Sequence, residues 1–428
     1  MDLEWRPILE GELATKAQAR IAQIGAALDL PKHAEPPRDT DPTLAEGHTG
    51  IALFVANAER EKNVPNIACR QDVAVSVLTR ALQDLDDRWR TPYLYSGIVG
   101  PAWALCYMFN QFGGAVDLSL QELEDQLIEL CAASDSALEP DLIYGFNGIG
   151  VYALERWPSK FTSDCIPLLI ERLANASWSD LGLAHGAAGV IAFLSAAARL
   201  DSGWRTHITP VVKQHVDRLL QQRLPANETT CAFPSEIGGG PTRLGWCLGD
   251  TSIAVALLAA GTAFDREDWC STARELALAA AKRPRGFSGV VDAGLCHGAA
   301  GLGHVFNRLF QATGEQRLAL AAREWFSVAL DMPARPAAPI LLPQSKLFGK
   351  TMEMPADGIA GFSAWTYSEG VGWHWVPDRG FLTGVAGIGL ALMAAIDEHE
   401  PTWDRVLLLS SRAPSSASAQ AGDQSRAQ

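Results

Sequence analysis

The sequence predicts an all-α protein, an α/α toroid (double α-barrel) of seven inner and seven outer helices. Three observations lead to this fold. A Gly-x-x-Gly unit recurs seven times, an almost wholly apolar run follows each unit, and longer amphipathic segments lie between the units. Self-similarity at a regular interval is typical of repeat architectures, in which neighbouring units bury each other's apolar faces. An open solenoid needs polar end caps, and neither terminal repeat is atypical enough to be one, so we expect a closed ring.

The inner helices are expected directly after the glycine units, whose first glycines stand at positions 47, 97, 145, 186, 249, 298 and 384. In the fifth unit Ser252 replaces the second glycine. The run after each unit is apolar or small on all sides, as a helix buried on every side requires. Glycine permits close approach and unusual dihedral angles where such a helix begins.

The outer helices are expected in the segments between the units, where apolar and charged positions alternate at three- and four-residue spacing. This pattern predicts amphipathic helices, each with one solvent-exposed face and one buried face. The clearest of these segments are 18–28, 73–86, 120–133, 208–222, 267–282 and 316–330.

Two parts of the chain fall outside the repeat. We expect one toroid domain over residues 1–411, interrupted at about 331–380 by an irregular insertion that crosses one end of the ring. The insertion is proline-rich at 333–343 and then aromatic, and its aromatic cluster could be a substrate surface or a small satellite core. Residues 412–428 are Ser-, Ala- and Gln-rich and are expected to be a disordered tail. The aromatic cluster contains Trp365, Tyr367, Trp373, His374 and Trp375.

Composition excludes several classes of protein. Of the 428 residues 48% are hydrophobic and 20% charged, and the formal net charge is −14. There is no basic cluster, which argues against a nucleic-acid partner. Acids stand at the N-terminus where a secretory signal carries positive charge, and no apolar run is long enough to span a bilayer. Eight cysteines without a compact disulfide spacing indicate a reducing compartment, so we expect a cytoplasmic protein.

Chemically reactive side chains gather in four consecutive repeats. Residues just before the first glycine of each unit should all lie at the same end of the ring. Repeats three to six place reactive groups there, whereas the other repeats offer only Glu46, Ser96 and Thr383. A single off-centre site would have this distribution. Its candidate residues are Asp141, His185, Cys247, Cys296 and His297.

Two cysteines and a histidine form the ligand set of a zinc site with one open position. Cys247 would contribute one sulfur, and Cys296 and His297 the other sulfur and a nitrogen. Adjacent residues on a helix point about 100° apart, so the last two must lie ahead of the helix to share an ion. Zinc bound to a substrate thiol would deprotonate it, which favours thiol chemistry, while hydrolysis by bound water stays open.

Other candidates have a structural alternative. The register of His185 with His297 favours a catalytic role. Asp141 could serve catalysis or cap a helix. Arg243 could donate to an oxyanion or pair with an acid. His48 and His304 are out of register and are expected to be structural. The remaining cysteines are expected to be small buried side chains, namely Cys69, Cys106, Cys131, Cys165, Cys231 and Cys270.

With these residues in view, the chain resembles the lanthionine synthetase C-like family, the cyclases that form thioether rings in lanthipeptides. The resemblance spans roughly residues 47–409. It is carried by Gly-Leu-Ala-His-Gly at 182–186, Trp-Cys-Leu-Gly at 246–249, Cys-His-Gly at 296–298, and the closing stretch from Phe-Leu-Thr-Gly at 381–384 to Trp-Asp at 403–404.

The resemblance implies an α/α toroid that binds one zinc ion through Cys247, Cys296 and His297. It implies that His185 is the catalytic histidine, Asp141 the active-site aspartate and Arg243 the arginine upstream of the Trp-Cys motif. The implied reaction is the addition of a peptide cysteine thiolate to dehydroalanine or dehydrobutyrine, giving lanthionine or methyllanthionine. His185 would protonate the α-carbon, and Arg243 would stabilise the enolate. Leu248 departs from the family, since better-known cyclases carry a tyrosine there.

The resemblance implies three partners: a dehydrated precursor peptide with leader and core, a separate dehydratase, and an exporter complex. The dehydratase is expected to be separate because the chain is too short to include one. Such partners could also hold the protein at the inner face of the membrane, and this peripheral location stays an open alternative. Two other functions also stay open. One is a thiol- or glutathione-binding or regulatory relative without cyclase activity. The other is thiol alkylation like that of the zinc-dependent protein prenyltransferases.

Overall fold

Each glycine unit opens an inner helix, as the sequence predicts. The computed structural model describes residues 4–28, 41–58, 71–83, 90–113, 119–225, 231–332, 358–368 and 370–410. Helices that follow the glycine units are buried almost throughout; α8, for instance, exposes little besides its last turns. They are α2 (His48–Ala58), α4 (Val99–Phe112), α6 (Phe146–Glu155), α8 (Ala187–Leu200), α10 (Asp250–Ala263), α12 (Ala299–Thr313) and α14 (Val385–Ile396).

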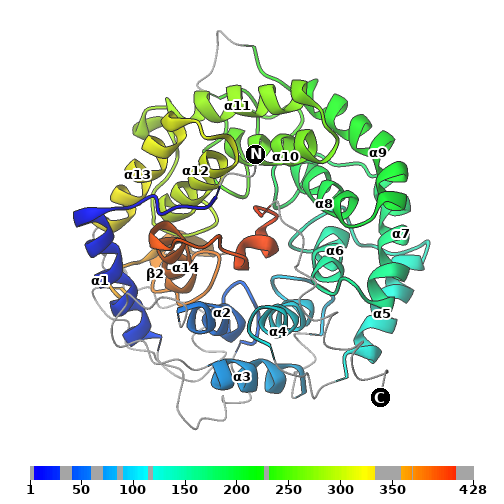
Figure 1. The fold of residues 1–428 in the computed structure, drawn as a ribbon, viewed down its shortest axis with the longest axis horizontal. Helices are drawn as coiled ribbons and strands as arrows, with labels where there is room; N and C mark the ends of the chain where they lie inside the picture. The colour runs from blue at the N-terminus through cyan, green and yellow to red at the C-terminus, as the bar shows by residue number, and fades with distance from the viewer. Residues whose placement is uncertain are drawn as a thin grey trace.

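The inner helices close into a ring, since each one packs against the next and α14 packs against α2. Figure 1 shows this ring surrounded by a second layer of helices, so the predicted α/α toroid is confirmed. The outer layer consists of α1 (Gly11–Ala27), α3 (Gln71–Gln83), α5 (Gln121–Ala132), α7 (Lys160–Ala174), α9 (Ser202–Leu220), α11 (Glu267–Ala281) and α13 (Gln316–Asp331). Six of these overlap the ranges expected from periodicity, and α7 is an addition to them.

The two ends of the described chain help to close the ring. Helix α1 packs against α13 and α14, although it lies at the opposite end of the sequence. The N–H groups of Ile8 and Leu9 both donate to the carbonyl of Ala395, at 2.8 and 3.0 Å. The outer helix that precedes the first repeat therefore covers the last inner helix.

The glycines are needed because a loop folds back over the start of each inner helix. A Cβ added to Gly186 would lie 1.9 Å from the carbonyl oxygen of Asp180, and one added to Gly189 would lie 2.4 Å from that of Leu183. Real side chains do not tolerate such contacts. In the fifth repeat Ser252 is accommodated instead, and its buried hydroxyl donates to the carbonyl of Gly249 at 2.9 Å.

The centre of the ring is filled by a 3₁₀ helix near the C-terminus, η4 (Trp403–Leu407), drawn in red in Figure 1. The fully buried carboxylate of Asp404 accepts hydrogen bonds from Arg308 Nε at 2.6 Å and His304 Nε2 at 2.7 Å. The ring of Trp403 stacks on His304 with centroids 5.0 Å apart. The expected structural role of His304 is thus to anchor this central segment.

The insertion between α13 and α14 is not irregular throughout. It contains an antiparallel hairpin of β1 (Ala364–Ser368) and β2 (Gly372–Val376). Residues 333–357 of the insertion, the predicted tail at 412–428 and Cys69 lie outside the described residues. A short 3₁₀ helix, η2 (Arg285–Phe287), precedes the loop that leads to α12.

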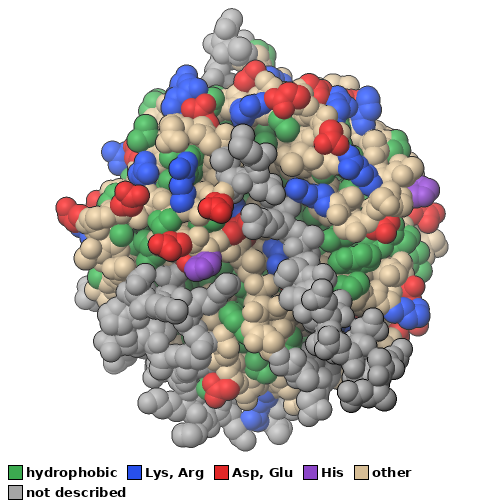
Figure 2. All heavy atoms as spheres, viewed as in Figure 1, with side chains coloured by type: hydrophobic (Ala, Val, Ile, Leu, Met, Phe, Trp, Pro, Cys, Tyr) green, Lys and Arg blue, Asp and Glu red, His purple; other side chains and the backbone are tan. Residues whose placement is uncertain are grey.

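Figure 2 shows one face of the molecule, on whose coloured, described part charged side chains of both signs are spread around the rim. No basic patch gathers on that part. Among the helices that the structure describes, none combines the length and the apolar character needed to cross a bilayer.

The buried ion pair of Asp404 gives a stability prediction. Removing one partner of a buried pair leaves the other charge uncompensated, so Asp404→Ala should lower the free energy of unfolding in urea by about 3–5 kcal/mol. The control is Asp217→Ala, which removes a half-exposed pair with Lys213 and should cost less than about 1 kcal/mol. Equal losses in the two variants would contradict the anchoring role of Asp404.

Candidate metal and acid–base site

The loops ahead of the inner helices are joined to one another by backbone hydrogen bonds. These bonds run between consecutive repeats, so each loop fixes the position of the next. They also place the backbone of both cysteines predicted to bind zinc. Ala184 N donates to Cys247 O at 3.1 Å, Trp246 N to Cys296 O at 2.9 Å, and Cys296 N to Leu382 O at 2.7 Å.

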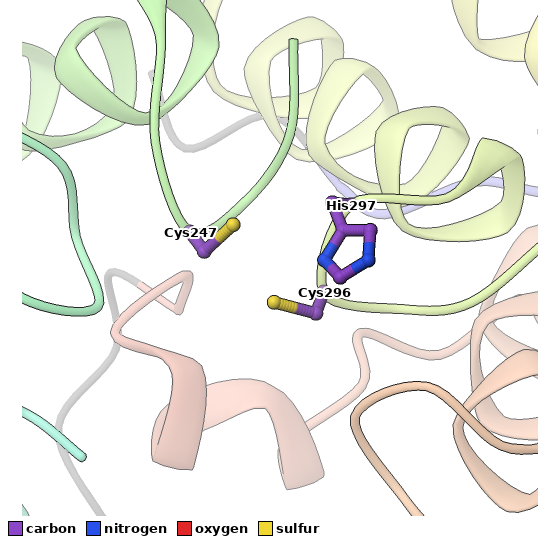
Figure 3. A group of neighbouring side chains, drawn as sticks. All are labelled: Cys247, Cys296 and His297. Carbon is purple, nitrogen blue, oxygen red and sulfur yellow. The ribbon is translucent and has the colours of Figure 1, made fainter. Parts of the chain in front are cut away.

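Three soft donors converge where the loops of repeats five and six meet. Sγ of Cys247, Sγ of Cys296 and a ring nitrogen of His297 all lie within 4.8 Å of one another. Figure 3 shows the three side chains turned toward the space between their two loops. Cys296 and His297 lie ahead of α12, which begins at Ala299, so they are free of the angular restriction of a regular helix.

The chemistry of this donor set fits a zinc ion. A tetrahedral centre with Zn–S bonds of about 2.3 Å needs its ligand atoms less than about 4 Å apart, which small side-chain rotations would achieve here. Both ring nitrogens of His297 are buried and have no hydrogen-bond partner within the described parts of the chain. Buried polar groups normally find a partner, so an imidazole that lacks one beside two thiols is best explained as a metal ligand.

The two thiols share a proton unequally. The pKa of the Cys247 thiol is held well below its ordinary range, because Cys296 donates a hydrogen bond to it and because His297 and Arg243 lie nearby. The pKa of Cys296 is raised well above its ordinary range by the same hydrogen bond and by burial. Metal ligation requires thiolates, and Cys247 is the sulfur already favoured in that form.

A histidine–aspartate pair lies in the neighbouring repeats. Nδ1 of His185 donates to Oδ2 of Asp141 at 2.8 Å, since a carboxylate only accepts. The other oxygen of Asp141 accepts from the backbone N–H groups of Ile143 at 2.6 Å and Tyr144 at 2.7 Å. These bonds fix the carboxylate. Because Nδ1 is engaged with Asp141, Nε2 of His185 is the ring nitrogen available to accept or donate a proton. The His185 side chain is 45% exposed, as a group that meets substrate must be.

The loop of His185 contacts the metal-ligand loop directly, because the residue before His185 donates its N–H to the carbonyl of Cys247. The pKa of His185 is raised above its ordinary value, chiefly by the hydrogen bond that its Nδ1 donates to Asp141, with further contributions from the charges of Asp141 and Cys247. Burial opposes this shift. A larger share of the imidazole is therefore protonated at neutral pH than in a free histidine.

Arg243 is half-buried and packs against Gly289, where an added Cβ would lie 2.4 Å from its own Cβ. Its charge lowers the pKa of both Cys247 and Cys296, so the guanidinium lies within electrostatic reach of both sulfurs. Across the ranges that the structure covers, Arg243 has no hydrogen-bond or ion-pair partner. The alternative that it merely pairs with an acid of this chain is not supported.

Two tyrosines near this site were not predicted. Tyr144 stacks on His185 with centroids 6.0 Å apart and planes 20° from parallel, and Tyr93 meets Tyr144 edge-on at 5.5 Å. A signal for Tyr144 exists in the sequence, because it directly precedes the first glycine of its repeat, as His185 and His297 do. Leu248 holds the same register position, half-buried and close to Gly182.

Four of the other described cysteines are buried as expected, and Cys270 is only half-buried. The four are Cys106, Cys131, Cys165 and Cys231, and none of the five belongs to the metal-ligand cluster. His48 lies at the start of α2, where its Nδ1 is 3.0 Å from the carbonyl oxygen of Asp41.

The chain is thus an α/α toroid in which a Cys₂His cluster that could hold a metal ion lies in the repeats next to a histidine–aspartate pair. Residues 38–331 match the family described as "Lanthionine synthetase C-like protein". This match covers more than half of the chain, and the protein belongs to the lanthionine synthetase C-like family.

Two individual similarities extend this result. "Glutathione S-transferase LANCL1" of Danio rerio is 24% identical over an alignment of 342 positions, which covers 72% of this chain and 79% of that protein. The solved structure of "Nisin cyclase" superposes with a TM-score of 0.63 over 93% of this chain and 97% of its own, at 18% identity. At that identity the structural likeness concerns the fold.

The ligand cluster gives a metal-binding prediction. The purified protein should hold one zinc ion per chain, and Cys296→Ala should lose most of it, because two donors bind zinc far more weakly than three. Metal analysis by mass spectrometry measures this. The matched control, Cys270→Ala, removes a half-buried cysteine outside the cluster and should retain the metal. Retention of a full zinc equivalent by Cys296→Ala would rule out this ligand set.

The pair of His185 and Asp141 gives a pH prediction. Because the carboxylate raises the folded-state pKa of His185, Asp141→Asn should lower that pKa, which an NMR titration of the imidazole would measure. The sign for stability follows. The pair contributes fully below the unfolded-state pKa of histidine, and the contribution is lost as the pH rises through the raised folded-state value. An unchanged pKa in Asp141→Asn would contradict the assigned cause.

Proposed function

We propose that this protein is a zinc-dependent lanthipeptide cyclase. It would form lanthionine and methyllanthionine rings by adding cysteine thiolates of a dehydrated precursor peptide to dehydroalanine or dehydrobutyrine. The observation that carries the proposal is the convergence of Cys247, Cys296 and His297 beside the oriented pair of His185 and Asp141. Family membership and the fold of the nisin cyclase structure support it.

Cys247, Cys296 and His297 would hold the zinc ion and leave one coordination position for the substrate. When bound, zinc would lower the pKa of a coordinated peptide thiol enough to give the thiolate at neutral pH. Cys247 is buried, whereas Cys296 and His297 are half-buried and His185 is 45% exposed, so the peptide would approach from the side of His185.

His185 would complete the addition as a general acid. A bond forms between the peptide sulfur and the β-carbon, the π electrons of the alkene move into an enolate, and Nε2 of His185 delivers a proton to the α-carbon. Asp141 keeps Nδ1 protonated and the ring oriented, and it favours the imidazolium that this role requires. The reaction is balanced, because the thiol loses one proton and the α-carbon gains one.

Arg243 would stabilise the negative oxygen of the enolate. The guanidinium carries a fixed charge, lies within electrostatic reach of the sulfurs and has no competing partner in the described structure. A donor aimed at developing charge is worth about 10²–10³ in rate in comparable sites. Leu248 cannot hydrogen bond to the enolate as a tyrosine could, so this role falls more heavily on Arg243.

The proposal extends to partners. A separate dehydratase would supply the unsaturated residues, and an exporter complex would remove the product. Cytoplasmic synthesis fits the absence of any membrane-crossing helix from the described residues, while attachment at the inner face of the membrane would depend on those partners.

A second function is favoured by one observation, the name "Glutathione S-transferase LANCL1" of the Danio rerio relative. The same donor cluster and acid could serve addition of a glutathione thiol to a dehydrated residue. The two reactions differ in product: cyclisation conserves the peptide mass, and glutathione addition increases it. The family match gives no support to the third alternative, thiol alkylation of the prenyltransferase type.

The acid role of His185 is open to a direct test. His185→Ala should slow ring formation at least about 100-fold, the usual contribution of a general acid, without loss of zinc. Because cyclisation does not change mass, the assay counts free thiols by alkylation and mass spectrometry of a dehydrated peptide. The control is His399→Ala, an exposed histidine at the end of α14 paired with Asp397. Survival of ring formation in His185→Ala would refute the assignment.

Including glutathione in the same assay separates the two functions. We expect the wild-type protein to consume the peptide thiol intramolecularly, with glutathione adducts a minor product. A dominant glutathione adduct, formed while the peptide thiol stays free, would support the second function against the first.

A further inference from the structure

The β1–β2 hairpin displays four aromatic side chains on one face. The pairing places Trp365 opposite Trp375 and Tyr367 opposite Trp373, two residues along each strand, so all four project from the same side. Their rings contact one another, with Trp365 and Trp373 stacked at 6.1 Å and Trp365 and Trp375 at 4.9 Å. We call this set the aromatic face.

The aromatic face is turned toward solvent. Tyr367 is 60% exposed and Trp373 is 53% exposed, whereas Ala364 and His374 on the opposite face are buried at 2% and 5%. A two-stranded sheet normally buries its apolar face. A contiguous aromatic patch left exposed marks an interaction site more often than chance packing. Of the two interpretations left open by the sequence, a satellite core does not fit this arrangement.

The hairpin is attached directly to the metal-ligand loop. The N–H of Trp365 donates to Oδ2 of Asp292 at 2.9 Å, and the other oxygen of Asp292 accepts from Gly294 at 3.1 Å, two residues before Cys296. At its other end β2 leads into the loop of the seventh repeat, where Leu382 O accepts the N–H of Cys296. The backbone of the hairpin is therefore joined to the loop that carries Cys296.

Carboxylates flank the hairpin. Burial raises the pKa of Glu46, and the charges of Asp378 and Asp41 raise it further, which places these three groups close together. Asp378 follows β2 by two residues, and Asp292 holds β1. Two arginines near the hairpin donate to backbone carbonyls, Arg379 to Ala27 O at 2.6 Å and Arg20 to Ala360 O at 2.8 Å. Aromatic faces and carboxylates both attract cationic side chains.

We propose that the aromatic face docks a segment of the peptide substrate that carries cationic and apolar side chains, next to the centre where its thiol reacts. This inference rests on the proposed function in taking the substrate to be a peptide. The aromatic face would supply rigid contact area, as tryptophan and tyrosine do at the centres of protein interfaces. Among these carboxylates Glu46 is exposed, and it would favour lysine or arginine in the docked segment.

Charge disfavours other occupants. A second copy of this chain carries a net charge of −14 and would be repelled at a carboxylate-flanked surface. An anionic bilayer would be repelled for the same reason. A cationic peptide segment is the partner whose charge complements the surface.

The test measures binding without chemistry. The probe is a fluorescein-labelled synthetic peptide with two lysines, one tryptophan and one dehydroalanine, and with serine in place of cysteine so that it cannot react. The double variant Tyr367→Ala/Trp373→Ala should bind it about 10-fold more weakly than wild type by fluorescence anisotropy, since two aromatic contacts are lost. The control is Leu320→Ala on α13, a similarly exposed apolar side chain at 62%, which should bind within about 2-fold of wild type.

A second arm tests charge. Replacing both lysines of the probe by glutamate should weaken its binding to the wild-type protein about 10-fold, and added salt should reduce the difference between the probes. Zinc content and thermal unfolding of the double variant show whether it keeps its fold. If it does not, Tyr367→Ser alone, at the most exposed position of the face, replaces it in the same comparison.

Unchanged affinity of a folded hairpin variant would overturn the proposal. So would a change in oligomeric mass, or in binding to phosphatidylglycerol vesicles, with peptide affinity intact, since the face would then serve a second copy or a membrane. Because the probe cannot react, failure of the proposed cyclase chemistry would show in the thiol assay and not here.

Discussion

The site depends on hydrogen bonds between the loops of neighbouring repeats. Cys247 and Cys296 are 49 positions apart and stand at the starts of different inner helices, so neither helix alone can bring their sulfurs together. The bond from Trp246 N to Cys296 O fixes the relative position of their backbones. The indole of Trp246 in turn donates to Leu407 O at 2.9 Å, which ties this loop to the segment that fills the ring. The same hydrogen bonds thus join neighbouring repeats of the ring and position the cysteines of the site.

This arrangement divides the chemistry between buried and exposed groups. The Cys247 side chain is buried and those of Cys296 and His297 are half-buried, a position in which two thiolates without a cation would be costly. His185 lies closer to solvent and is fixed through Asp141, whose second oxygen is held by two backbone N–H groups. The imidazole is thus accessible to solvent while it keeps its orientation. Tyr144 adds an aromatic contact to the exposed side of the same imidazole.

Much of this could be predicted from sequence because the glycine units record a backbone constraint. The loop carbonyl that lies against Gly186 leaves no room for a side chain. A required glycine therefore marks the start of an inner helix in the sequence, and the residues ahead of these helices lie at one end of the ring. That register was enough to collect Asp141, His185, Cys247, Cys296 and His297. Periodicity failed to single out α7, and the hairpin at 364–376 lacked a repeat to align with. The hairpin is attached to the rest of the protein by a tertiary hydrogen bond from Trp365 N to Asp292, which no local pattern encodes.

The central claim is that two sulfurs and one imidazole of this chain hold a zinc ion with a position open to a substrate thiol. X-ray absorption at the zinc edge tests it most directly, with the wild-type protein alone and with a dehydrated, cysteine-containing peptide. The account predicts two sulfur neighbours at about 2.3 Å in the protein alone and three once the peptide is bound. A sulfur count that stays at two when the peptide saturates the protein, or a first shell of only oxygen and nitrogen, would contradict it.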